Sequence, residues 1–251
     1  MHTESIDTKD TETEALPADA AEAIARLQQG NENYRSEGGQ LKIASWTAEK
    51  WKKEREELEP HQHPWAVIWG CIDSRVPPEI IFDCGLGELF VIRTAGQVPD
   101  AAGLGSLEFA VKNYESYPVK LVVVLGHTTC GAVKATVNNF NPSTPPSTED
   151  MGSIPVLVKV IAPAYTTAKI MWRETNDEEF WTHLKAHEDD KDHVKADSAG
   201  FLEQVIHANV QNQVYQLKTN PILAAAVNAG RIQIVGAIYD LQTGTVEWMT
   251  E

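Results

Sequence analysis

Three short stretches of uninterrupted apolar residues do most to constrain the fold of this 251-residue chain. They are Trp65 to Cys71, Leu89 to Ile92, and Leu121 to Leu125. A strand solvated on one face alternates apolar with polar residues, whereas a continuous apolar run is typical of a strand buried on both faces. Apolar residues recur at helical spacing over 107–114, between the second and third runs. The pattern therefore predicts strand–helix–strand crossovers and a parallel sheet covered by helices.

The rest of the chain fits an α/β fold of one domain. A helical arm is expected over 17–60, before the first strand. A long helix follows over 201–217, with Asn209 and Gln213 on the same side as its apolar residues. Ile232 to Tyr239 is a further buried strand, and the chain then turns into an antiparallel edge hairpin that ends near Trp248.

Two regions differ in composition from the rest of the chain. One precedes the single domain over 17–251, and the other lies within it. Residues 1–16 carry threonine and acids with little to bury, so we expect a disordered acidic lead-in. Residues 140–200 read as a loop and an acidic helical insertion, with a highly charged part over 173–198. His183 and His187 in that part have the spacing of a helical metal pair, but a solvated surface is the favoured interpretation.

Composition excludes several classes of protein. Lys and Arg number 21 against 36 Asp and Glu, and the formal net charge of −15 argues against nucleic acid and anionic membranes as partners. No uninterrupted apolar run approaches the roughly 20 residues of a membrane span. The acidic N-terminus does not resemble a signal peptide, and three cysteines do not suggest a disulfide framework. We therefore expect a soluble, cytoplasmic protein.

Reactive residues follow two of the predicted strands. Cys71 ends the first strand, and His127 and Cys130 come directly after the third. Because ligands bind at the carboxyl ends of parallel strands, these three side chains are expected to meet. Two thiolates and one imidazole suit Zn²⁺ and leave its fourth tetrahedral position open, which is the pattern of a catalytic site.

A charged pair lies beside the first of these ligands. Asp73 and Arg75 follow a buried strand, where opposite charges are costly unless they pair. We expect Arg75 to fix the carboxylate of Asp73 through paired donors.

The two motifs together resemble the β-class carbonic anhydrases. Cys-x-Asp-Ser-Arg at 71–75, His-x-x-Cys at 127–130 and the intervening segment from Val91 to Gly96 carry the resemblance, which extends from Ile24 to Asp240. It implies a Rossmann-like, mostly parallel sheet and one zinc ion per subunit, held by Cys71, His127 and Cys130. It also implies a homodimer or homotetramer with CO₂ and bicarbonate as its substrates.

The resemblance implies reversible hydration of CO₂, in which zinc-bound hydroxide attacks the carbon to give bicarbonate and a proton. Asp73 and Arg75 are then the catalytic residues. Asp73 would orient the hydroxide, or swing onto the zinc as a fourth ligand in a closed state. We expect the substrate-binding residues to be Arg93, Ala95, Gly96 and Gly131.

Two other functions remain open at this stage. The same scaffold could hydrolyse carbonyl sulfide or carbon disulfide, and more remotely the chain could be a non-catalytic zinc-binding or thiol redox-sensing protein. Thr94 stands where the family commonly has Asn, and many members place a substrate-facing Gln in the stretch that corresponds to 83–85. Cys84 in that stretch is interpreted as a buried free thiol.

Overall fold

A computed structural model describes residues 15–36, 41–113, 117, 119–140, 151–175 and 200–249. Its centre is a five-stranded sheet of order β2-β1-β3-β4-β5. The strands are β1 (Ala66–Cys71), β2 (Leu89–Thr94), β3 (Leu121–His127), β4 (Gln233–Tyr239) and β5 (Val246–Trp248). The first four run parallel, and β5 pairs antiparallel with β4. The predicted α/β fold with a C-terminal edge hairpin is confirmed.

The continuous apolar runs lie in the middle of the sheet, as expected. Every residue of β1 and β3 is buried, whereas every residue of the edge strand β2 is half-buried. The difference arises because β1 lies between two neighbouring strands, while β2 has only one. One edge of the sheet is therefore only partly covered.

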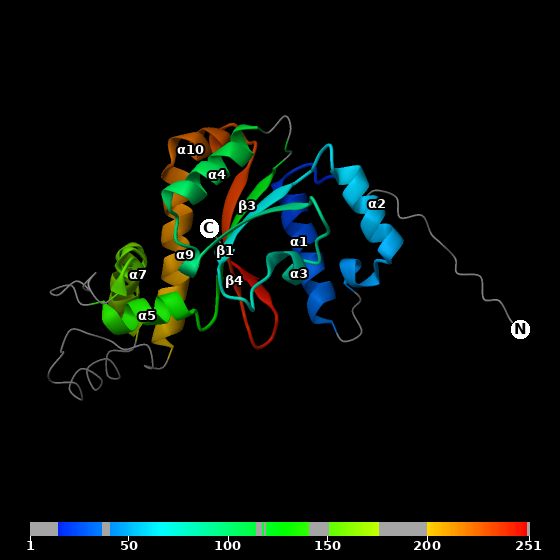
Figure 1. The fold of residues 1–251 in the computed structure, drawn as a ribbon. Helices are drawn as coiled ribbons and strands as arrows, with labels where there is room; N and C mark the ends of the chain where they lie inside the picture. Colours follow the sequence, from blue (N-terminus) through cyan, green and yellow to red (C-terminus); the bar gives the residue numbers. More distant parts are fainter. Residues whose placement is uncertain are drawn as a thin grey trace, which may run out of the picture.

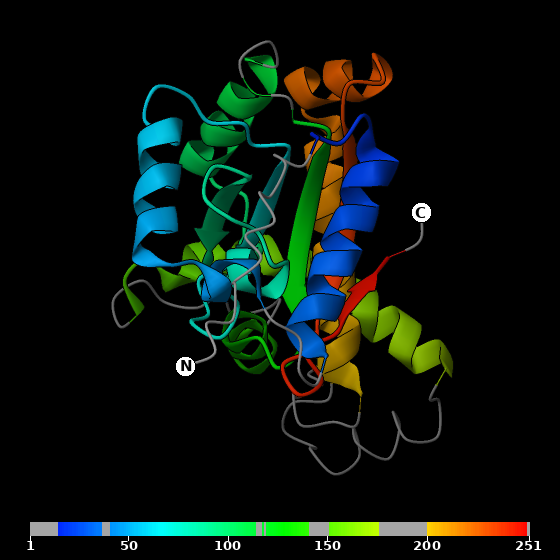
Figure 2. The same cartoon turned by 90° about the vertical axis from the view of Figure 1, so that its right-hand side faces the viewer.

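Helices cover both faces of the sheet (Figure 1). On one side lie α4 (Ala101–Lys112), α5 (Gly131–Asn139), α7 (Ile154–Thr175), α9 (Phe201–Thr219) and α10 (Pro221–Asn228). On the other lie α1 (Ala20–Arg35), α2 (Ala48–Leu58) and the short α3 (Pro78–Ile81). In the turned view, α1 runs along the sheet close to β3 (Figure 2). Two short 3₁₀ segments, η1 (Lys42–Ser45) and η2 (Ala95–Gln97), complete the described elements.

Side-chain caps define where several helices begin. Asp19 accepts from the Glu22 N–H at the start of α1, and Thr47 accepts from Lys50 at the start of α2. Asp100 caps α4 in the same way. Each cap satisfies an amide that the first helical turn leaves unpaired, so the boundaries follow from local chemistry.

The structure departs from expectation over α7. This segment falls within the 140–200 region that the sequence indicated as a loop and an acidic helical insertion, and it forms a 22-residue helix with one face buried in the core. Its buried residues lie on one face of the helix, which packs against α9 and α5: Val158, Ile161, Ala162, Ala164, Tyr165, Ala168 and Trp172. Most of the charged stretch 173–198 and most of the lead-in 1–16 lie outside the described residues.

By length and composition alone, one helix in the described part of the chain could span a bilayer. It is the Ile154–Trp172 portion of α7. The sequence shows no uninterrupted apolar run of this length, because Lys159 and Lys169 lie within it. Length and composition alone are weak evidence for a membrane span, and one face of α7 packs into the hydrophobic core here.

Candidate metal centre

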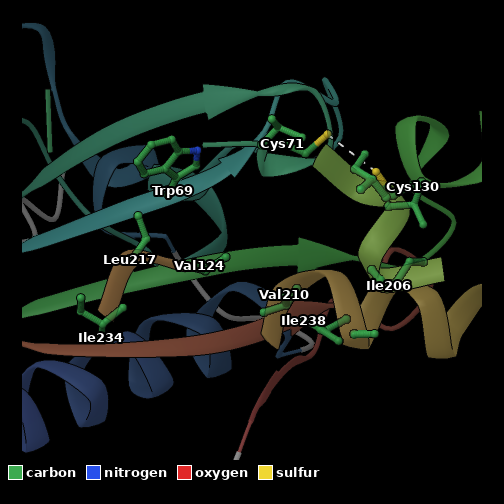
Figure 3. Close-up of a cluster of buried hydrophobic side chains, with 14 of the residues drawn as sticks. Trp69, Cys71, Val124, Cys130, Ile206, Val210, Leu217, Ile234 and Ile238 are labelled. Carbon is green, nitrogen blue, oxygen red and sulfur yellow. Dashed lines mark hydrogen bonds between the residues drawn. The ribbon is translucent and has the colours of Figure 1, made fainter. Parts of the chain in front are cut away.

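The carboxyl ends of β1 and β3 bring three ligand side chains together. Cys71 is the last residue of β1, His127 is the last residue of β3, and Cys130 immediately precedes α5. Their ligand atoms lie within 4.8 Å of one another, and all three residues are buried. The two sulfur atoms are 4.0 Å apart, as the dashed line in Figure 3 marks. The predicted meeting of these residues is confirmed.

The loop between His127 and Cys130 is anchored to the end of β4. The Thr128 N–H donates to the Tyr239 carbonyl at 3.0 Å, and the Thr128 hydroxyl accepts from the Leu241 N–H at 3.0 Å. Thr129 then adopts a left-handed φ of 54°, which is uncommon for a β-branched residue. Such strain persists only where surrounding contacts enforce it, and here it turns Cys130 back toward His127.

The imidazole of His127 is oriented for metal ligation. Its Nδ1 atom lies 2.9 Å from the Thr128 carbonyl oxygen, so Nδ1 carries the proton and donates to that oxygen. The Nε2 atom is buried, and the structure pairs it with no hydrogen-bond partner among the described residues. A buried nitrogen with a free lone pair is costly unless it binds something, and this arrangement is usual for a histidine that ligates a metal through Nε2.

The pKa values of the two thiols also indicate a site that needs a cation. A hydrogen bond from Cys130 lowers the pKa of Cys71, whereas the bond with Cys71, together with burial, raises the pKa of Cys130. One thiolate therefore forms readily, but a second negative charge 4.0 Å away requires a cation. Two sulfurs and one nitrogen form a donor set that fits Zn²⁺ with one position left over.

The carboxylate of Asp73 is held beside this site by Arg75, as the sequence predicted. Arg75 donates from Nε to Oδ1 at 3.0 Å and from its terminal NH₂ to Oδ2 at 2.7 Å, and its backbone N–H also reaches Oδ1 at 3.0 Å. These bonds hold the pKa of Asp73 well below its usual range. The Oδ2 atom lies 3.9 Å from Nε2 of His127, so a carboxylate that stays ionised faces the ligand cluster.

Arg93 supports the loop that carries Cys71 and Asp73. The register of β1 and β2 places Arg93 opposite Gly70, one residue before the ligand. Its guanidinium donates to the Cys71 carbonyl at 2.8 Å and to the Asp73 carbonyl at 2.5 Å. Both of these donors are directed at the backbone of the loop.

Gly96 approaches the first sulfur through its backbone. The Gly96 N–H donates to Cys71 Sγ at 3.3 Å, and the residue adopts a left-handed φ of 64°. A Cβ at this position would also lie 3.0 Å from Ile161 Cδ1, so a larger residue would combine backbone strain with a tight contact. Beside it, Ala95 begins η2, while the space around Gly131 is open, with nothing within 4 Å of where a Cβ would lie.

The two departures from the family pattern have local explanations. The Thr94 hydroxyl donates to the Val98 carbonyl at 2.7 Å and accepts from Trp69 Nε1 at 3.3 Å, so it stabilises the turn after β2. Cys84 is buried and free, its sulfur donates to the Phe82 carbonyl at 3.4 Å, and burial raises its pKa. The interpretation of Cys84 as a buried free thiol is confirmed.

Three residues around the site were missed by the sequence analysis. Thr128 matters through its backbone carbonyl, which no side-chain pattern reveals. Asn209 and Gln213 of α9 donate to the Gly96 carbonyl, and the available signal was the presence of two amides on an apolar helix face. His183 and His187 lie outside the described residues.

Comparison with known proteins identifies relatives over most of the chain. The family model described as carbonic anhydrase matches residues 66–246. A carbonic anhydrase of Mycolicibacterium smegmatis is 37% identical over 193 residues, which cover 77% of this chain and 78% of that protein.

Solved structures of the β class share the fold. The Coccomyxa β-carbonic anhydrase in complex with acetazolamide aligns with a TM-score of 0.59 at 24% identity, covering 84% of this chain and 87% of that one. A β-carbonic anhydrase of Sordaria macrospora, described as tetrameric, aligns with a TM-score of 0.59 at 19% identity, covering 81% of this chain and 90% of that one.

Proposed function

This chain belongs to the β-class carbonic anhydrase family, and from that premise we propose how its residues serve the zinc-dependent, reversible hydration of CO₂ to bicarbonate and a proton. One observation carries the proposal. Three buried ligand atoms lie within 4.8 Å of one another, beside an ionised carboxylate that Arg75 holds in place. The arrangement supplies three ligands, an open coordination position and a fixed hydrogen-bond acceptor at one edge of the sheet.

Zinc fits the donor set, with Cys71, His127 and Cys130 as its ligands. When bound, it supplies the Lewis acidity that makes hydroxide available near neutral pH. The chain supplies the orientation of the ligands. The Thr128 carbonyl fixes the tautomer of His127, and the Gly96 N–H donates to the sulfur of Cys71.

Asp73 is the proposed hydrogen-bond acceptor for the attacking nucleophile. Because Arg75 keeps it ionised, Asp73 accepts a hydrogen bond over the whole working pH range and does not act as a proton donor. The bidentate contact also fixes the direction of its lone pairs. A closed state, in which Asp73 leaves Arg75 to become a fourth ligand, would need both of these bonds to break.

The substrate-facing surface is proposed to include Ala95, Gly96 and Gly131, with Arg93 behind it. The open space at Gly131, where α5 begins, supports this assignment, since backbone amides at a helix start suit an anion such as bicarbonate. Arg93 contributes positive charge to the anionic product while it holds the Cys71 and Asp73 carbonyls.

We also propose that the chain works as a homodimer or homotetramer. The edge strand β2 is half-buried, and a groove of about 420 Å³ runs between it and α4, lined largely by apolar residues. Phe109 on this groove is 58% exposed. The Sordaria macrospora relative, described as tetrameric, gives the same expectation.

A single catalytic domain over 17–251 and a cytoplasmic location complete the proposal. The packing of α1 against β3 supports including the arm in the domain. Cys71, Cys84 and Cys130 are all free thiols, which is the usual state in a reducing compartment.

A pair of assays on the purified full chain tests the proposed reaction. CO₂ hydration followed by stopped flow should be rapid, and release of sulfide from carbonyl sulfide or carbon disulfide should be slow by comparison. Rapid sulfide release with slow CO₂ hydration would reassign the substrate. Absence of both activities in zinc-loaded protein would favour the non-catalytic alternative.

A further inference from the structure

We propose that Asn209 and Gln213 of α9 are positioning residues for the metal centre, acting through the backbone of Gly96 on the sulfur of Cys71. This inference rests on the proposed function, because it concerns residues behind the zinc ligands. Neither side chain makes a hydrogen bond to a ligand side chain within the described part of the chain. Their hydrogen bonds end on the carbonyl of Gly96, and the N–H of the same residue donates to the sulfur of Cys71.

Two side-chain amides converge on one carbonyl. Asn209 Nδ2 donates to the Gly96 carbonyl oxygen at 3.2 Å, and Gln213 Nε2 donates to the same oxygen at 3.1 Å. Gln213 Nε2 also donates to Asn209 Oδ1 at 3.0 Å, which joins the two side chains. Both residues are 1% exposed, so water does not compete for these bonds.

The other side of Gly96 faces the metal centre. Its N–H donates to Cys71 Sγ at 3.3 Å. Glycine reaches many backbone conformations at little cost, and this one has φ 64° and ψ 24°. Two donors on its carbonyl restrict that freedom and keep the N–H directed at the sulfur.

The position of α9 is set by two glycines of the sheet. A Cβ at Gly126 would lie 2.5 Å from Val210 Cγ2, and a Cβ at Gly236 would lie 2.8 Å from Val210 Cγ1. The absence of these side chains lets Val210, the neighbour of Asn209, press against β3 and β4, as in Figure 3. Gly126 directly precedes His127, so this contact packs α9 against the strand that carries that ligand.

Stability alone does not explain the amide pair. Burial of amides is costly unless every polar atom is paired, and Gln213 Oε1 has no hydrogen-bond partner. An apolar residue at 213 would avoid that cost, since the other buried residues of α9 apart from Asn209 are apolar. The retained amide is accounted for by the donor that it supplies to Gly96.

The test removes one donor at a time in near-isosteric variants and reads the metal–sulfur bond directly. Gln213→Met and Asn209→Leu each leave one donor on the Gly96 carbonyl, which should allow the full chain to fold. Gln204→Met is the matched control. It changes a glutamine of the same helix that does not donate to the Gly96 carbonyl in the described structure. Zinc is exchanged for Co²⁺, and the sulfur-to-cobalt charge-transfer band and the Co²⁺ affinity are measured by competition with a chelator.

In both variants we expect a shift of the charge-transfer band and an affinity loss of about 10-fold, at the lower end of the range for residues that support metal ligands. The control should match the wild-type chain. An unchanged band and affinity in both variants, even with lowered thermal stability, would overturn the proposal and leave only a structural role.

A measurement on the wild-type chain covers the case in which a variant does not fold. In protein loaded with ¹¹³Cd, the Gly96 amide should show a scalar coupling to the metal through the Cys71 sulfur. Absence of that coupling would also overturn the proposal. If the wild-type chain bound no metal, the proposed function would fail instead, so the two failures are distinguishable.

Discussion

The Oδ2 atom of Asp73 lies 3.9 Å from Nε2 of His127, a buried ligand nitrogen with no hydrogen-bond partner among the residues that the structure describes. This distance puts an oxygen of a carboxylate whose pKa Arg75 lowers beside the candidate metal ligands. The oxygen is held there by Arg75 and not by any metal ligand. The orientation of Asp73 is therefore separable from metal binding, and a variant of Arg75 can test it.

Arg75→Ala should lower kcat by about 10- to 100-fold, the range for residues that orient a metal site's first contacts, while one zinc per chain is retained. The cause is the loss of the paired donors that fix Asp73. Stopped-flow CO₂ hydration and metal analysis provide the two readouts. Arg75→Lys is the informative control, because a lysine keeps the charge but not the bidentate geometry, and it should recover only part of the rate. Full turnover in Arg75→Ala would remove Arg75 from the mechanism.

The rate should rise with pH through the mildly alkaline range. Two thiolates cancel the charge of Zn²⁺, whereas a site with three neutral histidines keeps it, so hydroxide becomes available at higher pH in this site. Asp73 adds no inflection there, because Arg75 holds its pKa well below its usual range and the carboxylate is already ionised. The check is kcat measured from about pH 6 to pH 9 at constant ionic strength. A flat profile would contradict the charge argument.

Gly126→Ala should destabilise the fold by about 1–3 kcal/mol through overpacking, since the new methyl group would lie 2.5 Å from Val210 Cγ2. Thermal or urea unfolding measures the loss. The double variant with Val210→Ala should recover part of the stability, because the clash is removed. Additive losses in the double variant would mean that the two residues do not meet as described.

The metal ligands could be predicted from the sequence, but the residues that hold them in place could not. Cys71, His127 and Cys130 were accessible because their strands carry unmistakable apolar runs, and parallel strands end at one edge. The contacts of Arg93 with the ligand loop could not be predicted, because they depend on the strand register that places Arg93 opposite Gly70. The core helix α7 was hidden because Lys159 and Lys169 interrupt its apolar run and a loop-rich stretch precedes it. The amides of α9 were visible on an apolar face, but their target, a backbone carbonyl, carries no sequence signal.

The turn after β4 should give the chain an acid-sensitive contribution to stability. The Asp240 carboxylate accepts from the N–H groups of Thr243 at 2.6 Å and Gln242 at 2.9 Å, and these bonds lower its pKa. The contribution is therefore present above the unfolded-state pKa of about 3.9 and is lost as pH falls through the lower folded value.

Asp240→Asn reads out this contribution. The variant should be less stable than the wild-type chain near neutral pH, by less than about 1 kcal/mol because the group is largely solvated. The difference should shrink below about pH 4. Urea unfolding of both proteins at a series of pH values provides the measurement. A difference in the free energy of unfolding that grew in acid would contradict the stabilising role of the ionised Asp240.

Zinc dependence of CO₂ hydration tests the central claim most directly. The full chain is stripped with a chelator, and zinc is then returned in measured amounts while stopped-flow hydration is followed. We predict that activity is lost on stripping and returns linearly until one zinc per chain is bound, and that Cys130→Ser neither binds zinc tightly nor recovers. Undiminished hydration in the stripped chain, or saturation at a stoichiometry other than one zinc per chain, would contradict the assignment of Cys71, His127 and Cys130 as the catalytic metal centre.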